Sequence, residues 1–584
     1  MSAAAVSSAY TAPKRPRRHM LFLALVVLRL VNVFLVQTFI HPDETWQSLE
    51  VAHRAVFGYG YITWEWRHAL RGFAHPMLFA AVYGALAMLR LDDTSLILVA
   101  PYVVVALIAA AIDYATFAFA KRLAGSQVAY WAVFCSAVSW TMGSGIVRPL
   151  VNSAETMLTA LAFVYWPWHH ASTAPPTYPA NNNRASLPFS LCLAALSCIV
   201  RPTSAVLWLC AGIVLLVNQP RHHGVSRTIR IIATTLLIGI IALATMLLVD
   251  YLGYKQWVFP PYQFYIFNVQ QDLGTWFGES PPLYHLYVSL PILFTSMLPF
   301  VIHGVYLSWC TKRVSVEPAV VAAMASFMFS LVGHMEYRFL YPLLPTGFMY
   351  CAISIQTLVG PLQHIHVAKK HDDPEPDPRS KSIWTVRNIA LYLLLTNIPA
   401  TLYLNLVHQR GVVDVFKYLR REVASNNVSQ IGFLMPCHST PFYSHLHKNI
   451  PMWFLSCEPP LDKQQLDTHY WEADDFEQSP ELFLQKIFST HNGQPQDTQQ
   501  GNAGGGRLLD GFMDNSAPVP GQKRSWPSHL VLYDAMVRRI DHVLVGQGYS
   551  ECARFFNTHF NGDSRRKGDV VVYCKKKTNK NKTR

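Results

Sequence analysis

The stretch MLFLALVVLRLVNVFLVQTFIHPDETWQ, residues 20–47, decides the fold class of this chain. Its apolar part, from about Met20 to Ile40, is long enough to cross a bilayer as a helix. Two carboxylates, Asp43 and Glu44, follow directly, and ionised groups beside the hydrocarbon are costly and usually kept for function. The alternative is that Asp43 caps a helix starting at Glu44, a position that aspartate fills well. The stretch predicts a membrane span followed by a reactive or a capping carboxylate.

The composition extends the membrane prediction to most of the chain. The protein has 584 residues, of which 51% are hydrophobic and 14% are charged, whereas soluble proteins carry roughly a quarter charged residues. The apolar residues gather in blocks at about 20–40, 75–91, 95–119, 128–147, 154–168, 188–218, 230–252, 284–308, 315–333, 338–358 and 384–407. A helical span needs ~20 apolar residues, and 188–218 holds either two spans or one broken one. We therefore predict a polytopic α-helical membrane protein with about 11–12 spans.

Basic residues set the expected orientation. Four of them precede the first span, and the positive-inside rule places such residues in the cytosol. They are Lys14, Arg15, Arg17 and Arg18. We expect residues 1–19 to form a cytosolic N-terminus and the loop 41–74 to face the lumen of an internal membrane. A cleaved signal peptide is the alternative, but the apolar run is too long and no small-residue cleavage site precedes His41.

The chain changes character after residue 408. Residues 409–584 contain no span-length apolar block, and short apolar runs alternate with helical stretches, which predicts a small soluble α/β domain. The strand-like runs are Gln430–Met435, Pro451–Leu455, His529–Tyr533 and Asp569–Tyr573. A stretch rich in Gln, Gly, Asn and Pro at about 491–525 predicts a disordered insertion. Residues 20–408 are then the transmembrane part.

Four of the ten cysteines fall in the soluble domain. They are Cys437, Cys457, Cys552 and Cys574. An even number suits two disulfides if this domain is luminal. The sequon Asn427-Val428-Ser429 favours the same side, because such acceptors are glycosylated in secreted and luminal segments. Zinc is the alternative ligand, but the sequence contains no Cys-x-x-Cys pair.

The net charge of +13 does not indicate a nucleic-acid-binding protein. Much of this charge lies in the basic N-terminus and in the lysine-rich tail 575–584. No basic patch interleaved with aromatic residues accompanies it, so nucleic acid is not expected as a partner.

Several polar clusters interrupt the apolar blocks. His334, Glu336 and Arg338 stand between two apolar runs, and the planar fork of an arginine is well suited to a phosphate. Further clusters are Arg148 with Asn152, Ser153 and Glu155, then Arg201 with Thr203, and the single Asp113. An ordinary charged turn or a structural ion pair is the alternative for each. Together they predict a polar cavity at the membrane face.

A carboxylate beside the bilayer together with arginines fits two classes of membrane protein. A transporter uses carboxylates for proton coupling. An enzyme acting on a lipid-linked phosphate uses one to deprotonate an acceptor hydroxyl, while cations stabilise the departing phosphate. Transporters often contain repeated halves, and this sequence shows no internal repeat. The aromatic-rich first loop and the soluble C-terminal domain favour an enzyme that handles sugars.

Two motifs carry a more specific signal. His41-Pro42-Asp43-Glu44-Thr45-Trp46-Gln47 and His334-Met335-Glu336-Tyr337-Arg338-Phe339 resemble the motifs of family 22 glycosyltransferases, which are GT-C enzymes that use dolichyl-phosphate mannose. Met335 departs from the family pattern, which has lysine there, so neutralisation of a phosphate would rest on Arg338 and His334. The stretches Met435–His445 and Pro451–Cys457 resemble the branch of the family that adds the third mannose to the glycosylphosphatidylinositol (GPI) precursor.

The resemblance implies a GT-C catalytic region over residues 20–408, located in the endoplasmic reticulum membrane. It also implies transfer of an α1,2-linked mannose, with inversion, from dolichyl-phosphate mannose to the two-mannose GPI precursor. The alternatives are another family 22 mannosyltransferase, acting on the fourth GPI mannose or on the N-glycan precursor, or a transporter. Lipid-linked substrates are the expected partners, and the sequence indicates no particular protein partner.

Inversion calls for direct displacement with one base on the acceptor hydroxyl. We predict Asp43 as this base, with Glu44 as the next candidate or as its orienting partner. The residues expected at the donor phosphate are His334, Glu336, Arg338 and Arg201. Those expected at the acceptor or its sugars are Trp46, Gln47, Glu50, Trp64 and Trp66, because aromatic faces stack on sugar rings, although Trp also marks membrane interfaces. No Asp-x-Asp lies in a loop next to a span, so neither an obligatory metal nor a cofactor is expected.

Overall fold

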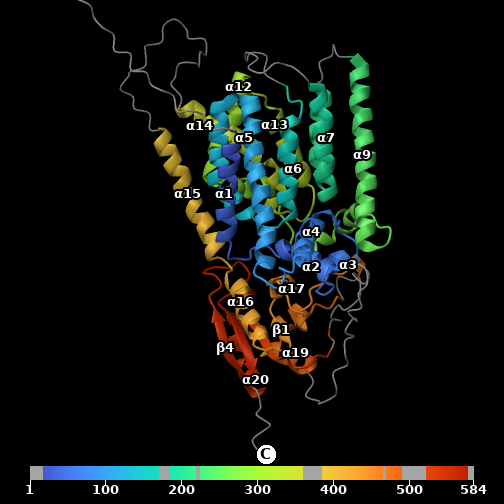
Figure 1. The fold of residues 1–584 in the computed structure, drawn as a ribbon, viewed down its shortest axis with the longest axis vertical. Helices are drawn as coiled ribbons and strands as arrows, with labels where there is room; N and C mark the ends of the chain where they lie inside the picture. Colours follow the sequence, from blue (N-terminus) through green and yellow to red (C-terminus); the bar gives the residue numbers. More distant parts are fainter. Residues whose placement is uncertain are drawn as a thin grey trace, which may run out of the picture.

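A computed structural model describes most of the chain. It covers residues 18–169, 183–218, 224–359, 385–464, 469–488, 521 and 523–576. Among the parts of the chain outside the described residues are the N-terminus through Arg17, with Lys14 and Arg15, most of the expected insertion at 491–525, and the tail from residue 577. Figure 1 shows two parts, a bundle of long helices and a smaller domain built on a β-sheet.

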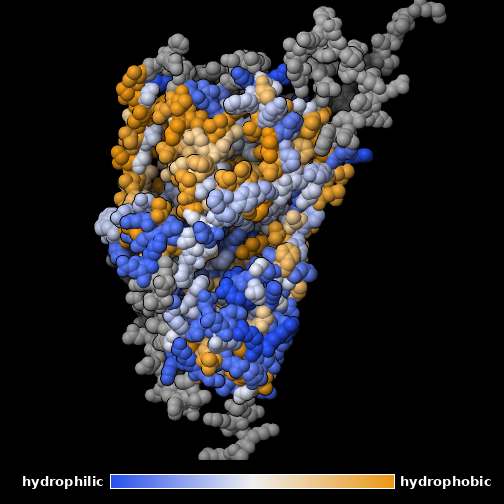
Figure 2. Space-filling view, turned by 180° about the vertical axis from the view of Figure 1, so that it is seen from behind, coloured by the Kyte–Doolittle hydropathy of each residue, from blue (hydrophilic) through white to orange (hydrophobic). Residues whose placement is uncertain are grey.

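The bundle is built from the apolar blocks. A lipid environment favours helices there, because a helix satisfies its own backbone hydrogen bonds. The helices are α1 (Arg18–Leu35), α5 (Leu96–Val138), α6 (Val151–Tyr165), α7 (Asn183–Val200), α8 (Ser204–Val217), α9 (Gly224–Tyr254), α11 (Leu290–Phe294), α12 (Leu298–Thr311), α13 (Glu317–Phe329), α14 (Leu344–Val359) and α15 (Val386–Leu406). Among the described residues, five helical stretches are each long and apolar enough to cross a membrane. Figure 2 shows apolar residues over much of the bundle and hydrophilic residues over the smaller domain.

One end of the bundle faces the C-terminal domain, and we call it the domain end. There the backbone N–H of Gln37, after α1, donates to the carbonyl of Asn405 in α15 at 2.7 Å. Lys417 of α16 (Gly411–Ala424), in the C-terminal domain, donates to the side chain of Gln37 at 2.9 Å. The segments that follow α1 and end α15 therefore meet the domain together.

Contacts at the opposite, far end join other segments. Glu317, which begins α13, accepts hydrogen bonds from His169 after α6 at 2.6 Å and from Asn218 after α8 at 2.7 Å. Gln356 of α14 donates to Gln127 of α5 at 3.3 Å. Along the chain, segments at the far end alternate with segments at the domain end, so the helices between them cross the bundle.

The chain traverses the bundle eleven times within the described residues. The traversals are α1, the two halves of α5, α6, α7, α8, α9, the run from His285 to the end of α12, α13, the run from Tyr337 through α14, and α15. The halves of α5 meet at Gly125, whose φ of +87° is readily adopted by glycine. The block 188–218 holds two helices, which meet at Arg201–Thr203.

The prediction that the apolar block 75–91 spans the membrane is wrong. It forms α4 (Ala74–Met88), which lies between the bundle and the C-terminal domain with α2 (Glu50–Phe57) and α3 (Trp64–Arg67), as Figure 1 shows. Both flanks of α4 stay at the domain end. The N–H of Phe73 donates to Asp250 at the end of α9 at 2.8 Å, and Asp93 pairs with Lys448 of the C-terminal domain at 3.0 Å. With 15 residues, α4 is also short for a span.

The C-terminal domain is built on a five-stranded sheet of order β2-β1-β3-β5-β4. Its strands are β1 (Ile431–Leu434), β2 (Met452–Phe454), β3 (His529–Tyr533), β4 (Tyr549–Phe555) and β5 (Val570–Lys575). Strand β1 is parallel to β2 and β3, and β5 is antiparallel to β3 and β4. Helices α18 (Glu472–Gln478), α19 (Pro480–Ile487) and α20 (Asp534–Gly546) cover one face, and α16 packs on the other.

The four cysteines of this domain form two disulfides, as expected, Cys437–Cys457 and Cys552–Cys574. A ring nitrogen of His438 lies within 4.8 Å of the sulfur atoms of Cys437 and Cys457, a spacing that could suit a zinc ion. Both sulfur atoms belong to the first disulfide, so this place offers zinc no free thiolate.

The first loop packs on the sheet face that carries α16. Phe39 and Trp46 belong to one buried apolar cluster with Ile431 and Phe433 of β1. The indole N–H of Trp46 donates to the carbonyl of Thr440 at 2.9 Å. The segment around Asp43 is thus held between the bundle and the C-terminal domain.

Candidate active site

Asp43 begins the first helical turn after α1. The N–H groups of Thr45 and Trp46 both donate to the carbonyl of Pro42, which closes this turn. The Asp43 carboxylate accepts a hydrogen bond from Nη2 of Arg338 at 2.6 Å, and its side chain is 24% exposed. Within the described part of the chain, no backbone N–H donates to it. The contacts therefore support a carboxylate in an open site rather than a helix cap.

Arg338 connects the two motifs that are far apart in the sequence. It lies in the 3-10 helix η8 (Tyr337–Leu343), and Asn152 of α6 fixes its position by donating to its carbonyl at 3.1 Å. Its guanidinium also holds Glu336 through two hydrogen bonds of 2.6 Å. The arginine thus stands between two carboxylates, Asp43 and Glu336.

His334 and Glu336 extend this polar chain. The Nε2 atom of His334 lies 3.7 Å from the Glu336 carboxylate, and its Nδ1 lies 2.8 Å from the carbonyl of Gly278. The neighbouring Glu336 carboxylate raises the pKa of His334 against the effect of burial. Burial opposes the charge of Glu336, but Arg338 and His334 outweigh it and hold the pKa of Glu336 well below its ordinary value. The structure brings together three of the four residues expected at the donor phosphate.

Arg201, the fourth, lies beside this chain of contacts. It pairs with Glu155 of α6 at 2.8 Å, and its guanidinium lies 4.9 Å from the ring centroid of Phe339. Glu155 also accepts a hydrogen bond from Ser204 at 2.5 Å. The structure places Arg201 next to the residue that follows Arg338, with its charge already balanced.

Glu44 occupies a different environment from Asp43. Its carboxylate pairs with Arg148 at 2.9 Å, and the two side chains are 1% and 0% exposed. It also accepts the N–H groups of Ile40 at 2.9 Å and His41 at 3.2 Å. The expectation that Glu44 is the next candidate base is corrected, because its oxygens are enclosed and already bonded.

Polar side chains that the sequence analysis did not select also lie around Asp43. Glu65 accepts from Arg71 at 2.6 Å and from Gln47 at 3.1 Å. Burial lowers the pKa of Arg71, but the carboxylates of Glu65 and Asp43 outweigh this effect and raise it above its ordinary value. Gln47, expected at the acceptor, is therefore tied to a charged pair close to Asp43. The sequence feature that could have identified this pair is Glu65, a carboxylate that lies between Trp64 and Trp66 in the first loop.

His41 lies on the Arg338 side of the same site. Its Nε2 is 2.8 Å from the hydroxyl of Tyr337. Burial, with the charge of Arg338, lowers the pKa of His41 to about 4. This imidazole is therefore neutral at physiological pH and orients the Tyr337 hydroxyl.

The expectation that Trp46, Trp64 and Trp66 offer ring faces to sugars is corrected. They are 3%, 6% and 1% exposed. Trp46 packs against Phe442 and Phe454, Trp64 against Phe267 and Phe277, and Trp66 against Phe73 and Tyr254. Their ring faces contact protein, so their packing holds the first loop in place.

Glu50 is corrected in the same way. It is fully buried in α2, and its Oε1 accepts the N–H of Phe442 at 3.1 Å and both the N–H and the hydroxyl of Ser444 at 2.9 and 2.6 Å. Burial raises the pKa of Glu50 to about 7 against these hydrogen bonds. Glu50 joins the first loop to the C-terminal domain instead of facing a substrate.

Met335, where the family motif has lysine, is 5% exposed. The hydroxyl of Ser280 is hydrogen-bonded to its backbone N–H at 2.9 Å. The position is thus a packed one in which methionine fits as an apolar side chain. Arg338 and His334 are left as the cations of this motif.

Comparison with known proteins agrees with this geometry. A family model described as the Alg9-like mannosyltransferase family matches residues 20–447. GPI mannosyltransferase 3 of Yarrowia lipolytica is 37% identical, over 96% of this chain and 98% of its own length. GPI alpha-1,2-mannosyltransferase 3 of Mus musculus is 34% identical, over 94% of this chain and 88% of its own length. The corresponding protein of Homo sapiens is 32% identical, over 95% and 87%.

Solved structures agree in fold. The crystal structure of ArnT from Cupriavidus metallidurans in the apo state superposes with a TM-score of 0.53 at 12% identity, over 95% of this chain and 97% of that one. The same protein bound to undecaprenyl phosphate gives 0.54 at 11% identity, over 96% and 98%. This likeness confirms the expected polytopic GT-C fold. The family model and the full-length relatives show that the chain belongs to the Alg9-like mannosyltransferase family.

Proposed function

We propose that this protein transfers the third mannose of the GPI anchor, in α1,2 linkage, from dolichyl-phosphate mannose to the two-mannose GPI precursor. Three of its full-length relatives bear names that state this class of activity. The observation that carries the proposal is the contact between Asp43 and Arg338, 295 residues apart in the sequence. A carboxylate and a guanidinium lie side by side at the end of a membrane bundle, and this supports a base next to a phosphate-binding cation.

The reaction follows from this pair. Asp43 accepts the proton of the acceptor hydroxyl as that oxygen forms its bond to the anomeric carbon of the donor mannose. The bond from this carbon to the phosphate oxygen breaks on the opposite face, which inverts the configuration. Dolichyl phosphate leaves with an added negative charge, which Arg338 and the protonated form of His334 stabilise.

Arg338 also couples donor binding to base activation. Its guanidinium bonds Asp43 and Glu336. A donor phosphate competes with the Asp43 carboxylate for the same fork of donors. Binding of the donor then frees Asp43 for the acceptor, while Glu336 keeps Arg338 oriented.

The proposal includes the location and the charge balance of the site. The two disulfides and the sequon at Asn427 support a luminal C-terminal domain. The domain end, with the first loop, then faces the lumen of the endoplasmic reticulum, and eleven traversals leave the N-terminus in the cytosol. We expect the transfer to need no metal ion or other cofactor, with Arg338 and His334 as the cations that contact the phosphate.

A transfer assay tests this function. Microsomes containing the protein receive radiolabelled dolichyl-phosphate mannose and defined GPI intermediates with one, two or three mannoses. We expect extension of the two-mannose intermediate alone. Extension of the three-mannose intermediate, or of an N-glycan precursor, would assign a different acceptor, and a lack of transfer with altered solute uptake would point to a transporter.

A further inference from the structure

His438 stands at the centre of a short C-terminal segment that reaches the first loop. Its ring centroid lies 4.5 Å from that of Trp46 and 5.3 Å from that of Phe454. Trp46 follows Asp43 by three residues in one helical turn, so the two side chains are neighbours on that turn. The C-terminal domain therefore presents an imidazole on the Trp46 side of Asp43.

The backbone of His438 is held in an unusual conformation. Its φ is +55°, in the left-handed region that non-glycine residues seldom adopt. Such a conformation persists where the surroundings determine it, and it is frequent at functional sites. On one side Cys437 is fixed by its disulfide, and on the other the carbonyl of Thr440 accepts the indole N–H of Trp46.

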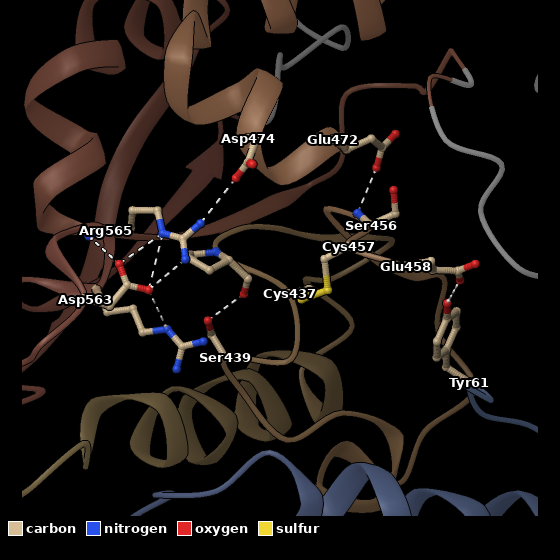
Figure 3. The surroundings of a disulfide bond; sticks show 12 residues. Tyr61, Cys437, Ser439, Ser456, Cys457, Glu458, Glu472, Asp474, Asp563 and Arg565 are labelled. Carbon is tan, nitrogen blue, oxygen red and sulfur yellow. Dashed lines mark hydrogen bonds and ion pairs between the residues drawn. A yellow bond between two sulfur atoms is a disulfide. The ribbon is translucent and has the colours of Figure 1, made fainter. Parts of the chain in front are cut away.

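Figure 3 shows how the surroundings of this disulfide are fastened. The hydroxyl of Ser439 donates to the carbonyl of Pro436 at 2.5 Å. Next to Cys457, Glu458 accepts a hydrogen bond from Tyr61 of the first loop at 3.1 Å and pairs with Arg67. The ring nitrogen nearest the disulfide lies within 4.8 Å of both sulfur atoms. The imidazole is thus held in place by contacts with both the first loop and the domain.

These contacts leave the imidazole without a hydrogen-bond partner among the residues that the structure describes. Burial lowers the pKa of His438 to about 4, and the nearby Asp43 carboxylate opposes this only in part. A neutral imidazole offers one N–H donor and one nitrogen acceptor. A sugar hydroxyl also donates and accepts one hydrogen bond each, so it matches the neutral imidazole. A phosphate would be bound better by a cation.

We propose that the imidazole of His438 hydrogen-bonds the acceptor mannose beside the hydroxyl that Asp43 deprotonates, so that the C-terminal domain contributes directly to the acceptor site. The proposal rests on the function proposed above and extends it to acceptor recognition. Arg338 approaches Asp43 from η8, on the donor phosphate side, and His438 approaches from the C-terminal domain. The acceptor sugar then lies between the base and this domain.

Steady-state kinetics of the purified full-length protein test the role of His438. The variants are His438→Phe, which keeps a ring between Trp46 and Phe454 but has no polar atom, and His438→Asn, which tolerates left-handed φ and keeps a donor and an acceptor. His445→Gln is the matched control, because burial likewise lowers the pKa of His445 to about 4 but its ring contacts Ser444. We expect the KM for the two-mannose GPI intermediate to rise about tenfold in His438→Phe, the effect of one lost hydrogen bond, and to rise less in His438→Asn. The KM for dolichyl-phosphate mannose should change less than twofold.

An unchanged acceptor KM in folded His438 variants would overturn the proposal while leaving the mannosyltransferase function intact. Failure of the wild-type protein to extend the two-mannose intermediate would instead contradict the function itself. Chemical modification gives a second test that needs no variant. Diethyl pyrocarbonate should label His438 in the wild-type protein, and the two-mannose intermediate, but not dolichyl phosphate, should protect it. Equal labelling with and without the acceptor would contradict the proposal.

Discussion

Asp43 and Glu44 are adjacent carboxylates that each pair with an arginine, yet their surroundings differ. Glu44 and Arg148 are 1% and 0% exposed, and backbone N–H groups bond the same carboxylate. Asp43 is 24% exposed and, within the described residues, bonds only Arg338. A buried and fully bonded pair fixes structure, because losing either partner strands a charge. The partly exposed Asp43 can release Arg338 and bind a substrate group instead. We therefore propose that Asp43, and not Glu44, carries the chemistry.

The largest expected effect comes from Asp43→Asn. The amide keeps the size of the side chain but cannot accept a proton, so transfer should fall by ~10³-fold or more. The thermal midpoint of the purified protein should change little, because the site is partly open. Turnover near the wild-type value would reduce Asp43 to a structural residue.

A smaller loss is expected for Arg338→Lys. Lysine keeps the charge but lacks the planar fork that holds Asp43 and Glu336 together. We expect the KM for dolichyl-phosphate mannose to rise and kcat to fall, with about a hundredfold loss in kcat/KM. The dependence of the transfer rate on donor concentration checks this. A change confined to the KM for the acceptor would contradict a role of Arg338 at the donor phosphate.

Glu44→Gln should act on stability and not on chemistry. Removing one partner of a buried pair destabilises a protein by about 3 kcal/mol, and Arg148 would keep its bonds to Thr38. Thermal unfolding and limited proteolysis measure the loss. The kcat of the protein that remains folded should stay within about threefold of the wild type, so a thousandfold drop in that kcat would make Glu44 part of the chemistry.

The smallest effect concerns pH at the junction between the first loop and the C-terminal domain. Burial raises the pKa of Glu50 from 4.5 to about 7, so the folded protein holds this proton more tightly than the unfolded chain. The resulting stabilisation is complete below pH 4.5 and is lost as the pH rises through 7. The thermal midpoint of the wild type should therefore fall relative to Glu50→Gln between pH 5 and pH 8. Parallel curves would show that Glu50 does not titrate in this range.

The sequence predicted the class of fold and most of the strands. Four strand-like runs coincide with β1, β2, β3 and β5. Strand β4 was missed because it is an edge strand with exposed charged side chains, Glu551 and Arg554, and so lacks an apolar run. Helix α4 was taken for a span because it is as apolar as one. The tertiary contacts of its flanking residues, Phe73 and Asp93, keep both of its ends at the domain end of the bundle.

The sequence predicted the motifs of the site, but not which of their residues face the site and which are buried in structural contacts. Asp43 and Arg338 were selected by motif, and the structure brings them together. The burial of Glu44 depends on Arg148, 104 residues away, and no local pattern shows that pairing. Trp46 and Glu50 looked like site residues because they share the loop of Asp43. Their partners, Thr440 and Ser444, lie in the C-terminal domain, and local sequence reasoning could not place that domain against the loop.

Single-turnover transfer per folded molecule, measured side by side for Asp43→Asn and Glu44→Gln, tests the central distinction most directly. Each variant is saturated with radiolabelled dolichyl-phosphate mannose, and the two-mannose GPI intermediate starts the reaction. We expect Glu44→Gln to transfer mannose at close to the wild-type rate and Asp43→Asn to transfer almost none although it binds the donor. An active Asp43→Asn together with a folded but inert Glu44→Gln would contradict this distinction.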